Sequence, residues 1–550
     1  MDEQQLLNGP RVRRGHDFRP EAGNPQMQDR IAHRTPAYAS QPTNELLTCR
    51  LADSSTAAIT PDWVKQAVFY QIFPDRFAKS DSLDKPHNLE EWDSDPTPFG
   101  YKGGDLAGVR ERLDYLQDLG VTALYFNPIF QSASNHRYHT HDYYKVDPLL
   151  GGDEAFDALL AECRRRGMRI VLDGVFNHAS RGFFQFNDVL ENGSASPWLD
   201  WFIFHEHPAN AYDHCQPPGY EAWVGLHALP EFNTDNPQVR EYLMRVGEYW
   251  LRKGIDGWRL DVPFEIHSEG FWQEFRQRVK AINPEAYIVG EVWGDSRPWL
   301  QGDQFDGVMN YLFAEAAIAF SAGHRVRRET VENRSYSPWP GIDGRAYAAK
   351  IEHLLRLYPW PIQLTQLNLL DSHDTSRFLT IAGEDRASVQ IGTLLLFTFP
   401  GAPSIYYGDE IGLTGALPDH WARKIFPWDH PDHWDLDSLA FHKALIALRR
   451  SHPALQTGDY APIYADPDVY AFARILEGSM LIAAVNVAEQ PRRFEIPLTD
   501  PLPAQPATPT ILFATDGSPT TEMAPGKLML TLPTRSGAVF DASPAPDNRA

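Results

Sequence analysis

Arg259 and Asp261 form the most conspicuous reactive pair in the chain. They stand in GIDGWRLDVPFEI (254–266), a short segment in which apolar side chains alternate with the two charged ones. Side chains two apart on a strand point to the same face, so the guanidinium and the carboxylate would lie together. Two interpretations are open: a structural ion pair, or a carboxylate held ionised so that it can attack an electrophile.

Other acids and several histidines also follow apolar segments. The acids are Asp173, Asp261, Glu291 and Asp374, and the histidines are His178, His373 and either His136 or His139. Converging carboxyl groups are typical of glycoside hydrolysis, in which one acid protonates the leaving oxygen while another attacks the anomeric carbon. Arg259 favours an ionised Asp261, which makes that residue the candidate nucleophile. The apolar neighbours of Glu291 raise its pKa, which suits a general acid.

These acids can converge only if the strands that carry them end at the same edge of the fold. From Ala67 onward, apolar strands alternate with amphipathic helices, two of which end in glycine, a C-cap signal. The expected strands are 67–73, 121–128, 169–177, 257–262, 286–292, 305–311, 364–370 and 402–408. The expected helices are 105–120, 152–167, 237–254, 270–282, 346–357, 386–398 and 436–450. This alternation predicts an α/β fold built on a parallel (β/α)8 TIM barrel, whose functional groups lie at the C-terminal ends of the strands.

Composition shifts predict further parts of the chain. Residues 452–541 hold short alternating stretches separated by proline and glycine, typical of an antiparallel β-sandwich domain. The predicted parts are a largely disordered extension at 1–60, the catalytic barrel at 61–451 with a subdomain inserted after strand three at 178–235, the β domain at 452–541 and a tail at 542–550.

The charge balance restricts the partners. Fifty basic against seventy-three acidic residues give a formal net charge of −23, which repels nucleic acid and acidic lipid. No apolar run approaches the roughly 18 residues of a membrane span, and the first residues lack the apolar core of a signal peptide. Three cysteines, Cys49, Cys163 and Cys215, give no disulfide framework. We therefore expect a cytoplasmic protein that binds neither nucleic acid nor membranes.

Several motifs resemble the α-amylase family of glycoside hydrolases. Its four signature stretches are matched by DGVFNH (173–178), GWRLDV (257–262), GEVW (290–293) and LLDSHD (369–374). Its fifth and eighth-strand regions are matched by LPEFN (229–233) and PGAPSIYYGDE (400–410). The branch of maltodextrin glucosidases, neopullulanases and cyclomaltodextrinases is indicated by VFYQIFPDRF (68–77), YKGGDL (101–106) and SNHRYHTHDY (134–143). The resemblance runs from about Pro61 to Asp541.

The resemblance implies a role for each matching residue. Asp261 would be the nucleophile, Glu291 the acid/base and Asp374 a third acid that binds sugar hydroxyls, while Arg259 would orient Asp261. Tyr138 would stack on the sugar ring, and Asp173 would be a supporting, largely structural acid. The remaining substrate-binding candidates are His178 and His373 in the same subsite, Trp293, Glu265 and Asn233 on the leaving-group side, and Arg377 on the other side.

The implied reaction is retaining hydrolysis of α-1,4-glucosidic bonds in maltodextrins, cyclomaltodextrins or pullulan, through a covalent glucosyl-enzyme and without an organic cofactor. A 4-α-glucanotransferase would use the same intermediate with a sugar hydroxyl in place of water. Sucrose or trehalose chemistry is an alternative at the level of substrate. A non-catalytic carbohydrate-binding or scaffold protein on the same fold is an alternative of another class, although all three catalytic acids are present.

Two features depart from the family pattern. About sixty residues precede the barrel, too few for the N-terminal β-sandwich of many relatives, so an oligomer would not form through that module. Several relatives also bind calcium in the loop after the first strand. Here a structural calcium would draw on Asp81, Asp84, Gly103 and Asp105. Lys79 and Lys85 stand where the relatives place ligands, and an ammonium is a poor neighbour for a dication.

Overall fold

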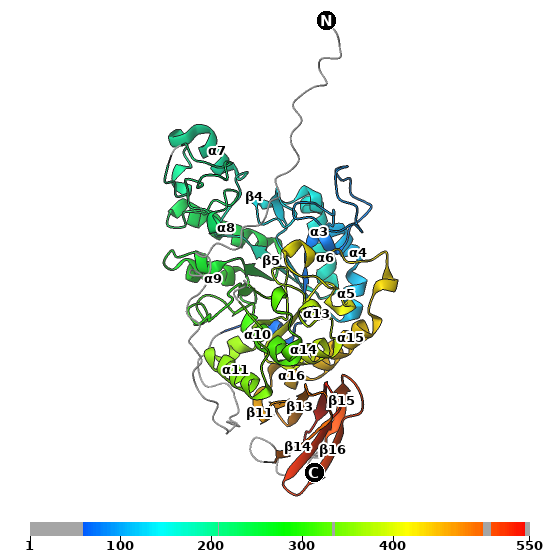
Figure 1. Cartoon of the computed structure of the whole chain (residues 1–550). Coiled ribbons are helices and arrows are strands. Elements are labelled where there is room, and N and C mark those ends of the chain that lie inside the picture. The colour runs from blue at the N-terminus through cyan, green and yellow to red at the C-terminus, as the bar shows by residue number, and fades with distance from the viewer. Residues whose placement is uncertain (1–58, 207, 333–335, 499–507, 545–550) are drawn as a thin grey trace. The chain divides into compact units, whose positions relative to one another are not determined.

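The computed structural model describes residues 59–206, 208–332, 336–498 and 508–544, and its core is a parallel barrel (Figure 1). Within these residues, eight strands pair in the order β8-β7-β6-β5-β2-β1-β10-β9, and a parallel bridge between Met309 and Leu367 closes the ring. The strands are β1 (Phe69–Ile72), β2 (Ala123–Phe126), β5 (Arg169–Gly174), β6 (Gly257–Leu260), β7 (Tyr287–Gly290), β8 (Gly307–Val308), β9 (Leu367–Asn368) and β10 (Ala402–Tyr406). The predicted (β/α)8 barrel is therefore confirmed.

Helices cover the outside of the barrel strands. The longer ones are α6 (Gly152–Arg165), α8 (Pro237–Lys253), α9 (Phe271–Ile282), α10 (Tyr311–Ala322), α11 (Gly344–Leu357), α14 (Arg386–Thr398) and α15 (Leu436–Ser451). The shorter ones are α2 (Asp62–Gln66), α3 (Pro74–Phe77), α4 (Leu106–Glu111), α5 (Leu113–Leu119), α12 (Trp360–Gln363), α13 (Phe378–Ile381) and α16 (Pro453–Thr457). The helix expected at 105–120 is split into α4 and α5, and it ends at Gly120 in the left-handed region.

Helix α10 was not among the expected helices. Its sequence, YLFAEAAIAFSA, is almost uniformly apolar, and nearly all of its residues are buried. It packs against α11 and α14, so little of its surface faces water (Figure 1). A helix buried on several sides lacks the polar face that produces a 3.6-residue period, which is why the sequence pattern did not reveal it.

Two excursions from the barrel lie near the C-terminal ends of its strands. A hairpin of β3 (Phe130–Ser132) and β4 (Thr140–Val146) follows β2, and its turn carries Tyr138. The segment between β5 and α8 contains α7 (Phe184–Asn192) and isolated bridges such as His178 with Glu231. Aromatic rings pack this segment, including Phe186 against Phe202 with ring centroids 4.9 Å apart.

The described residues of the C-terminal part form two antiparallel sheets. One has the order β11-β12-β13-β18-β15 and the other β14-β17-β16. Their strands are β11 (Asp459–Ala465), β12 (Val469–Leu476), β13 (Ser479–Asn486), β14 (Arg492–Pro497), β15 (Thr510–Ala514), β16 (Thr520–Ala524), β17 (Lys527–Leu532) and β18 (Ser536–Asp541). Ile482, Phe494, Leu530 and Phe540 belong to an apolar cluster shared by the two sheets. This arrangement confirms the expected β-sandwich.

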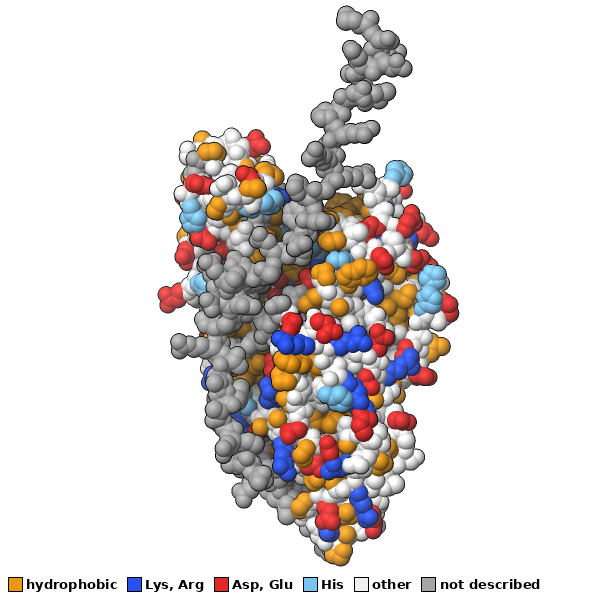
Figure 2. Space-filling model, in the orientation of Figure 1, with side chains coloured by type: hydrophobic (Ala, Val, Ile, Leu, Met, Phe, Trp, Pro, Cys, Tyr) orange, Lys and Arg blue, Asp and Glu red, His pale blue; other side chains and the backbone are white. Residues whose placement is uncertain are grey.

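The expectation of a disordered extension at 1–60 concerns residues that, apart from the last two, lie outside the described part of the chain. The tail expected at 542–550 is described only as far as 544. Within the described residues, no helix combines the length and the apolar character needed to cross a bilayer. On the face drawn in Figure 2, acidic and basic side chains are interspersed, so the excess of negative charge is not gathered in one patch there.

Candidate active site

The acids singled out from the sequence lie at one rim of the barrel. Asp173 is the second-to-last residue of β5, Asp261 follows β6 directly, and Glu291 follows β7 directly. In the register of the sheet, Leu260 pairs with Gly290, so the next residue on each strand is Asp261 and Glu291. Both side chains therefore emerge at the same level of neighbouring strands, as functional groups of this fold do.

Arg259 connects three of these carboxylates. Its Nη1 lies 2.8 Å from Asp173 Oδ1 and 2.8 Å from Asp261 Oδ1, and its Nη2 lies 2.9 Å from Glu291 Oε2. The arginine is fully buried, and Asp261 and Glu291 are 7% and 4% exposed. The same-face prediction for Arg259 and Asp261 is met. Arg259 Nη1 donates a hydrogen bond to Asp261, and Nη2 lies within ion-pair distance of Glu291, so the two acids face a common space.

The backbone after Asp261 is strained. Val262 has φ 34° and ψ 51°, a left-handed conformation that a β-branched residue rarely adopts and that costs on the order of 1–3 kcal/mol. In this conformation, Val262 N donates a hydrogen bond to Glu291 Oε2 at 3.1 Å. The strained residue thus connects the backbone next to Asp261 with the carboxylate of Glu291. Strand periodicity could not predict this hydrogen bond.

Tyr138 and His373 form a second part of the site. Gln71 Nε2 lies 2.9 Å from His373 Nδ1 and donates to it, which leaves His373 Nε2 as the nitrogen that carries the proton. That nitrogen lies 2.6 Å from Tyr138 Oη and 3.0 Å from Asp374 Oδ2. The Tyr138 hydroxyl donates in turn to Asp173 Oδ2 at 2.9 Å, and its ring stacks on the imidazole. A series of close polar contacts therefore joins Asp374 to the Arg259 cluster.

Arg423 also belongs to the site, although no sequence motif pointed to it. Its Nη2 lies 3.1 Å from Asp374 Oδ1 and 3.1 Å from Asp419 Oδ2, and its Nε donates to the His373 carbonyl. The residue comes from the loop after β10, far from LLDSHD in sequence. The sequence feature that could have pointed to Arg423 is its position after the eighth strand, because the loops that follow barrel strands all lie at the same rim.

Burial governs the protonation of the acids. Burial raises the pKa of Glu291 to about 7, Arg259 opposes this shift, and Asp374 adds to it. Burial likewise raises the pKa of Asp261 well above its usual range, with further contributions from Glu291 and Asp173. We expected Arg259 to hold Asp261 ionised; it does lower this pKa, but burial is the larger effect. The carboxylates therefore titrate as a coupled set that retains a proton near neutral pH.

The histidines of the site are held neutral. Burial lowers the pKa of His178 to about 3 and that of His373 well below its usual range. Among the described residues, nothing hydrogen-bonds to the buried Nε2 atom of His178, whose ring stacks on Trp223 with centroids 5.5 Å apart. A neutral imidazole with a spare nitrogen is suited to bind an uncharged hydroxyl group.

The three residues predicted on the leaving-group side, Trp293, Glu265 and Asn233, differ in how close they lie to the Arg259 cluster. Trp293 Nε1 donates to Glu291 Oε1 at 3.2 Å, and the indole stacks on Tyr311 with centroids 3.7 Å apart. Glu265 is part-exposed in the turn that follows Asp261. Asn233 lies in the inserted segment, where its side chain donates to the Asp200 carbonyl. Of these three, Trp293 is the one that directly contacts an acid of the cluster.

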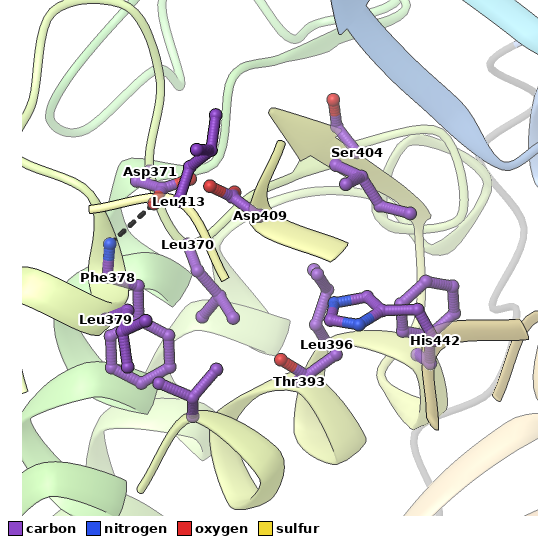
Figure 3. Close-up of a pocket in the computed structure, with 13 residues that line it drawn as sticks. Leu370, Asp371, Phe378, Leu379, Thr393, Leu396, Ser404, Asp409, Leu413 and His442 are labelled. Atoms are coloured by element: carbon purple, nitrogen blue, oxygen red, sulfur yellow. Dashed lines mark hydrogen bonds between the residues drawn. The ribbon is translucent and has the colours of Figure 1, made fainter. Parts of the chain in front are cut away.

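Arg377 is buried beside the segment that follows β10. It is fully buried, its Nη1 lies 2.7 Å from Asp409 Oδ1, and its guanidinium stacks on Tyr406. Asp409 also contacts Asp371 (Figure 3), whose carboxylate accepts a hydrogen bond from Phe378 N at 2.6 Å. The sequence predicted a substrate contact for Arg377, whereas the structure gives its side chain partners within the protein.

A small cavity adjoins Asp371 and Asp409 (Figure 3). Its other walls are largely apolar and include Leu370, Leu396 and His442. The cavity measures about 30 Å³, which leaves room for only a very few water molecules. It is therefore too small for a sugar ring and is not a second substrate site.

The calcium candidates do not form a cluster. Asp105 is fully buried, whereas Asp81 and Asp84 are exposed. Asp105 Oδ2 and the Gly103 carbonyl both accept hydrogen bonds from Lys85 Nζ. Across the described residues, no group of three histidine, cysteine, aspartate or glutamate side chains is placed to hold a metal ion. This arrangement does not fit a dication, because an ammonium already binds the two inner oxygen donors.

The comparison with known proteins agrees with this site. Residues 71–433 match the family model described as the catalytic domain of α-amylase. A cyclomaltodextrinase of Geobacillus thermopakistaniensis (strain MAS1) is 42% identical over 442 residues, which is 80% of this chain and 71% of that protein. Neopullulanase 2 of Thermoactinomyces vulgaris is 43% identical over 433 residues, covering 78% of this chain and 70% of that protein.

A solved structure covers the same part of the chain. The debranching enzyme of Nostoc punctiforme, in its native form, is 56% identical and superposes with a TM-score of 0.82, over 88% of this chain and all of that one. A barrel whose rim carries paired carboxyl groups, together with these matches, defines a glycoside hydrolase. The chain belongs to the α-amylase family.

Proposed function

We propose that this enzyme hydrolyses α-1,4-glucosidic bonds of maltodextrins, cyclomaltodextrins or pullulan with retention of anomeric configuration. The observation that carries the proposal is the shared guanidinium of Arg259, whose two terminal nitrogens lie close to Asp261 and Glu291. Retention requires two carboxyl groups close enough for one to attack the anomeric carbon while the other protonates the leaving oxygen.

The proposed first step forms a covalent intermediate. Asp261 attacks the anomeric carbon, and Glu291 gives its proton to the glycosidic oxygen as the bond to the leaving sugar breaks. In the second step, ionised Glu291 takes a proton from water, and the resulting hydroxide oxygen displaces Asp261 from the anomeric carbon. Two inversions give net retention, and both acids return to their starting protonation states.

The environment of the two acids favours this division of roles. Arg259 Nη1 donates to Asp261, which stabilises the ionised form required for attack. Glu291 has a pKa of about 7 because it is buried, so a proton is available for the leaving oxygen near neutral pH. The state with the proton on Glu291 is the reactive one.

The remaining polar groups suit an uncharged sugar. His178 and His373 are neutral, Tyr138 offers an aromatic ring beside them, and Asp374 is a carboxylate that can bind two hydroxyl groups. The named relatives include a cyclomaltodextrinase, a neopullulanase and a debranching enzyme, which supports α-glucans as the substrate class. The proposed steps use no organic cofactor, and we propose that the enzyme works in the cytoplasm.

The test is a product analysis with matched variants. Purified protein is incubated with cyclomaltodextrin, pullulan, soluble starch, maltotriose and sucrose, and the products are resolved by chromatography. We expect shorter maltodextrins from the α-glucans, and at least a 10³-fold loss of this activity in Glu291→Gln. Glu269→Gln, at an exposed position, is the control and should retain activity. Products longer than the maltotriose supplied would identify a glucanotransferase, and unchanged sugars in every reaction would contradict the proposal.

A further inference from the structure

The loop between α3 and α4 is closed by a lysine. Lys85 Nζ donates to the Gly103 carbonyl and to Asp105 Oδ2, which lie at the other end of the loop. We infer that the Lys85 ammonium takes the position and the structural role of a divalent cation here, so that the loop formed by residues 78–105 folds without calcium. The inference concerns stability and does not depend on the proposed reaction.

The charges at this position balance without a metal. Asp105 is fully buried and accepts hydrogen bonds from Gly108 N at 2.6 Å and from Ser80 N at 2.9 Å, in addition to Lys85. One carboxylate and one ammonium are neutral together. Calcium needs six to eight oxygen ligands, usually with several carboxylates, and it would place two further positive charges next to the ammonium. Asp81 and Asp84 remain exposed instead of turning inward to compensate.

The backbone at Gly103 turns its carbonyl toward the lysine. Gly103 has φ +80°, and a Cβ built on it would lie 2.7 Å from Leu89 Cδ1. A larger residue would therefore be strained by both conformation and contact. The oxygen donors for a cation are thus preformed, and the group that faces them is the ammonium of Lys85.

Other lysines of the same loop are used in a similar way. Lys102 Nζ donates to the carbonyls of Glu91 and Ser94 at 2.8 and 2.7 Å and to Ser94 Oγ at 2.6 Å, so its three hydrogens are directed at loop oxygens. Lys79 places its ammonium 5.3 Å from the centroid of the buried Trp92 ring. The loop therefore gains its cross-links from ammonium groups at several points.

The loop also supports the turn that carries Tyr138. Asn135 Nδ2 donates to the carbonyls of Pro98 and Gly100 at 3.1 and 2.9 Å. Tyr138 lies three residues further along, so the loop braces the side of the active site that this ring forms. Loss of the contacts that hold this loop should lower the unfolding temperature. Activity should fall only near that temperature.

The experiment measures calcium binding and unfolding temperature. The wild-type protein, Lys85→Met and Lys85→Asp are melted in EDTA and in millimolar calcium chloride. We expect the wild type to melt at one temperature in both. Lys85→Met should melt about 2–4 °C lower in both, because it leaves the buried Asp105 carboxylate unpaired. Lys85→Asp should melt lower in EDTA and regain a similar amount in calcium, because the change removes the ammonium that excludes the ion and adds a second carboxylate beside Asp105 and the Gly103 carbonyl.

Three results would overturn the inference. In the first, the wild type binds one calcium ion per chain by equilibrium dialysis and melts at a lower temperature in EDTA. In the second, Lys85→Met melts at the same temperature as the wild type. In the third, calcium does not raise the melting temperature of Lys85→Asp. Lys145→Met and Lys145→Asp are the matched controls, since Lys145 is 61% exposed and pairs with Asp153 at the surface. If neither Lys85 variant folds, calcium binding by the wild type decides the question alone.

Discussion

Arg259 carries one positive charge and faces three carboxylates. Asp173, Asp261 and Glu291 all contact its guanidinium, and burial prevents water from screening their repulsion. One guanidinium cannot neutralise three buried carboxylates, so their pKa values rise and the cluster retains a proton near neutral pH. A structural ion pair would use one carboxylate and leave no proton to transfer, which is why the number of acids on this arginine bears on function.

The protonation of Glu291 sets the alkaline limit of activity. Its pKa is raised to about 7, and the acid form is needed to protonate the leaving oxygen, so kcat/KM should fall as pH rises through about 7. Trp293→Phe removes the indole N–H that donates to Glu291 Oε1 and favours its ionised form. The alkaline limb should therefore move to higher pH in this variant. A limb that stays in place, or moves down, would show that another group sets it.

The hydroxyl of Tyr138 should affect turnover more than binding. Tyr138→Phe keeps the ring stacked on His373 but removes the link to Asp173. We expect about a tenfold loss of kcat, with KM little changed, because the loss of one hydrogen bond to a charged group costs about 1.5 kcal/mol. Steady-state kinetics on maltotriose measure both constants. Tyr144→Phe, in the following strand, is the control; an equal loss in both variants would count against a positioning role for Tyr138.

At the scale of the element, the loop after β9 carries two groups of residues with different partners. His373 and Asp374 face the rim, whereas Asp371 and Arg377 contact Asp409. The contacts with Asp409 fix both ends of the short segment that presents Asp374. Arg377 therefore connects this loop to Asp409 and to the Ala422 carbonyl, and its contact with the substrate stays a prediction.

Replacing Arg377 should destabilise the enzyme. Arg377→Met leaves the part-buried Asp409 carboxylate without its cation, which should cost about 1–3 kcal/mol. Arg377→Met with Asp409→Asn removes both charges and should recover part of this loss. Thermal unfolding measures the effect, and KM measured well below the melting temperature should stay within about twofold. A large rise in KM with unchanged stability would instead support the substrate contact expected from the sequence.

Sequence alone placed the strands and the acids but not the directions of several side chains. The acids were predictable because a residue at the end of a parallel strand has little choice but to face the rim. Arg377 and Lys85 were not, because each lies in a loop with no period, where burial and local partners decide which way the side chain turns. The strain at Val262 depends on a contact with Glu291, about thirty residues away in sequence, and leaves no local signature.

At the scale of the whole molecule, buried arginines join the barrel to the C-terminal sheets. Arg474 in β12 donates to the carbonyls of Thr398 at 2.7 Å and Gly458 at 2.9 Å, and Arg449 in α15 shares the Leu455 carbonyl with it. Both side chains are fully buried. Positive charge at the C-terminal end of α14 also interacts favourably with the helix dipole. The two parts are therefore expected to unfold together.

Arg474→Met tests this connection. The variant leaves buried carbonyl groups without donors at about 1–3 kcal/mol each, so its melting temperature should fall by several degrees. Calorimetry should show a single transition for both proteins, with activity lost in that same transition. The control is Arg493→Met, since Arg493 pairs with Glu522 at the surface. Two separate transitions in the wild type would mean that the sandwich and the barrel are independent.

The most direct test of the account is to trap the intermediate that it requires. A fluorinated α-glucosyl fluoride reacts quickly with the nucleophile, but the glycosyl ester that forms is hydrolysed slowly. The sugar therefore stays on the enzyme, and the labelled peptide can be identified by mass spectrometry. We predict one sugar per chain on the peptide that contains Asp261, and none in Asp261→Asn. A sugar on another residue, or inactivation without any covalent adduct together with a product of inverted configuration, would contradict the assignment of Asp261 and Glu291.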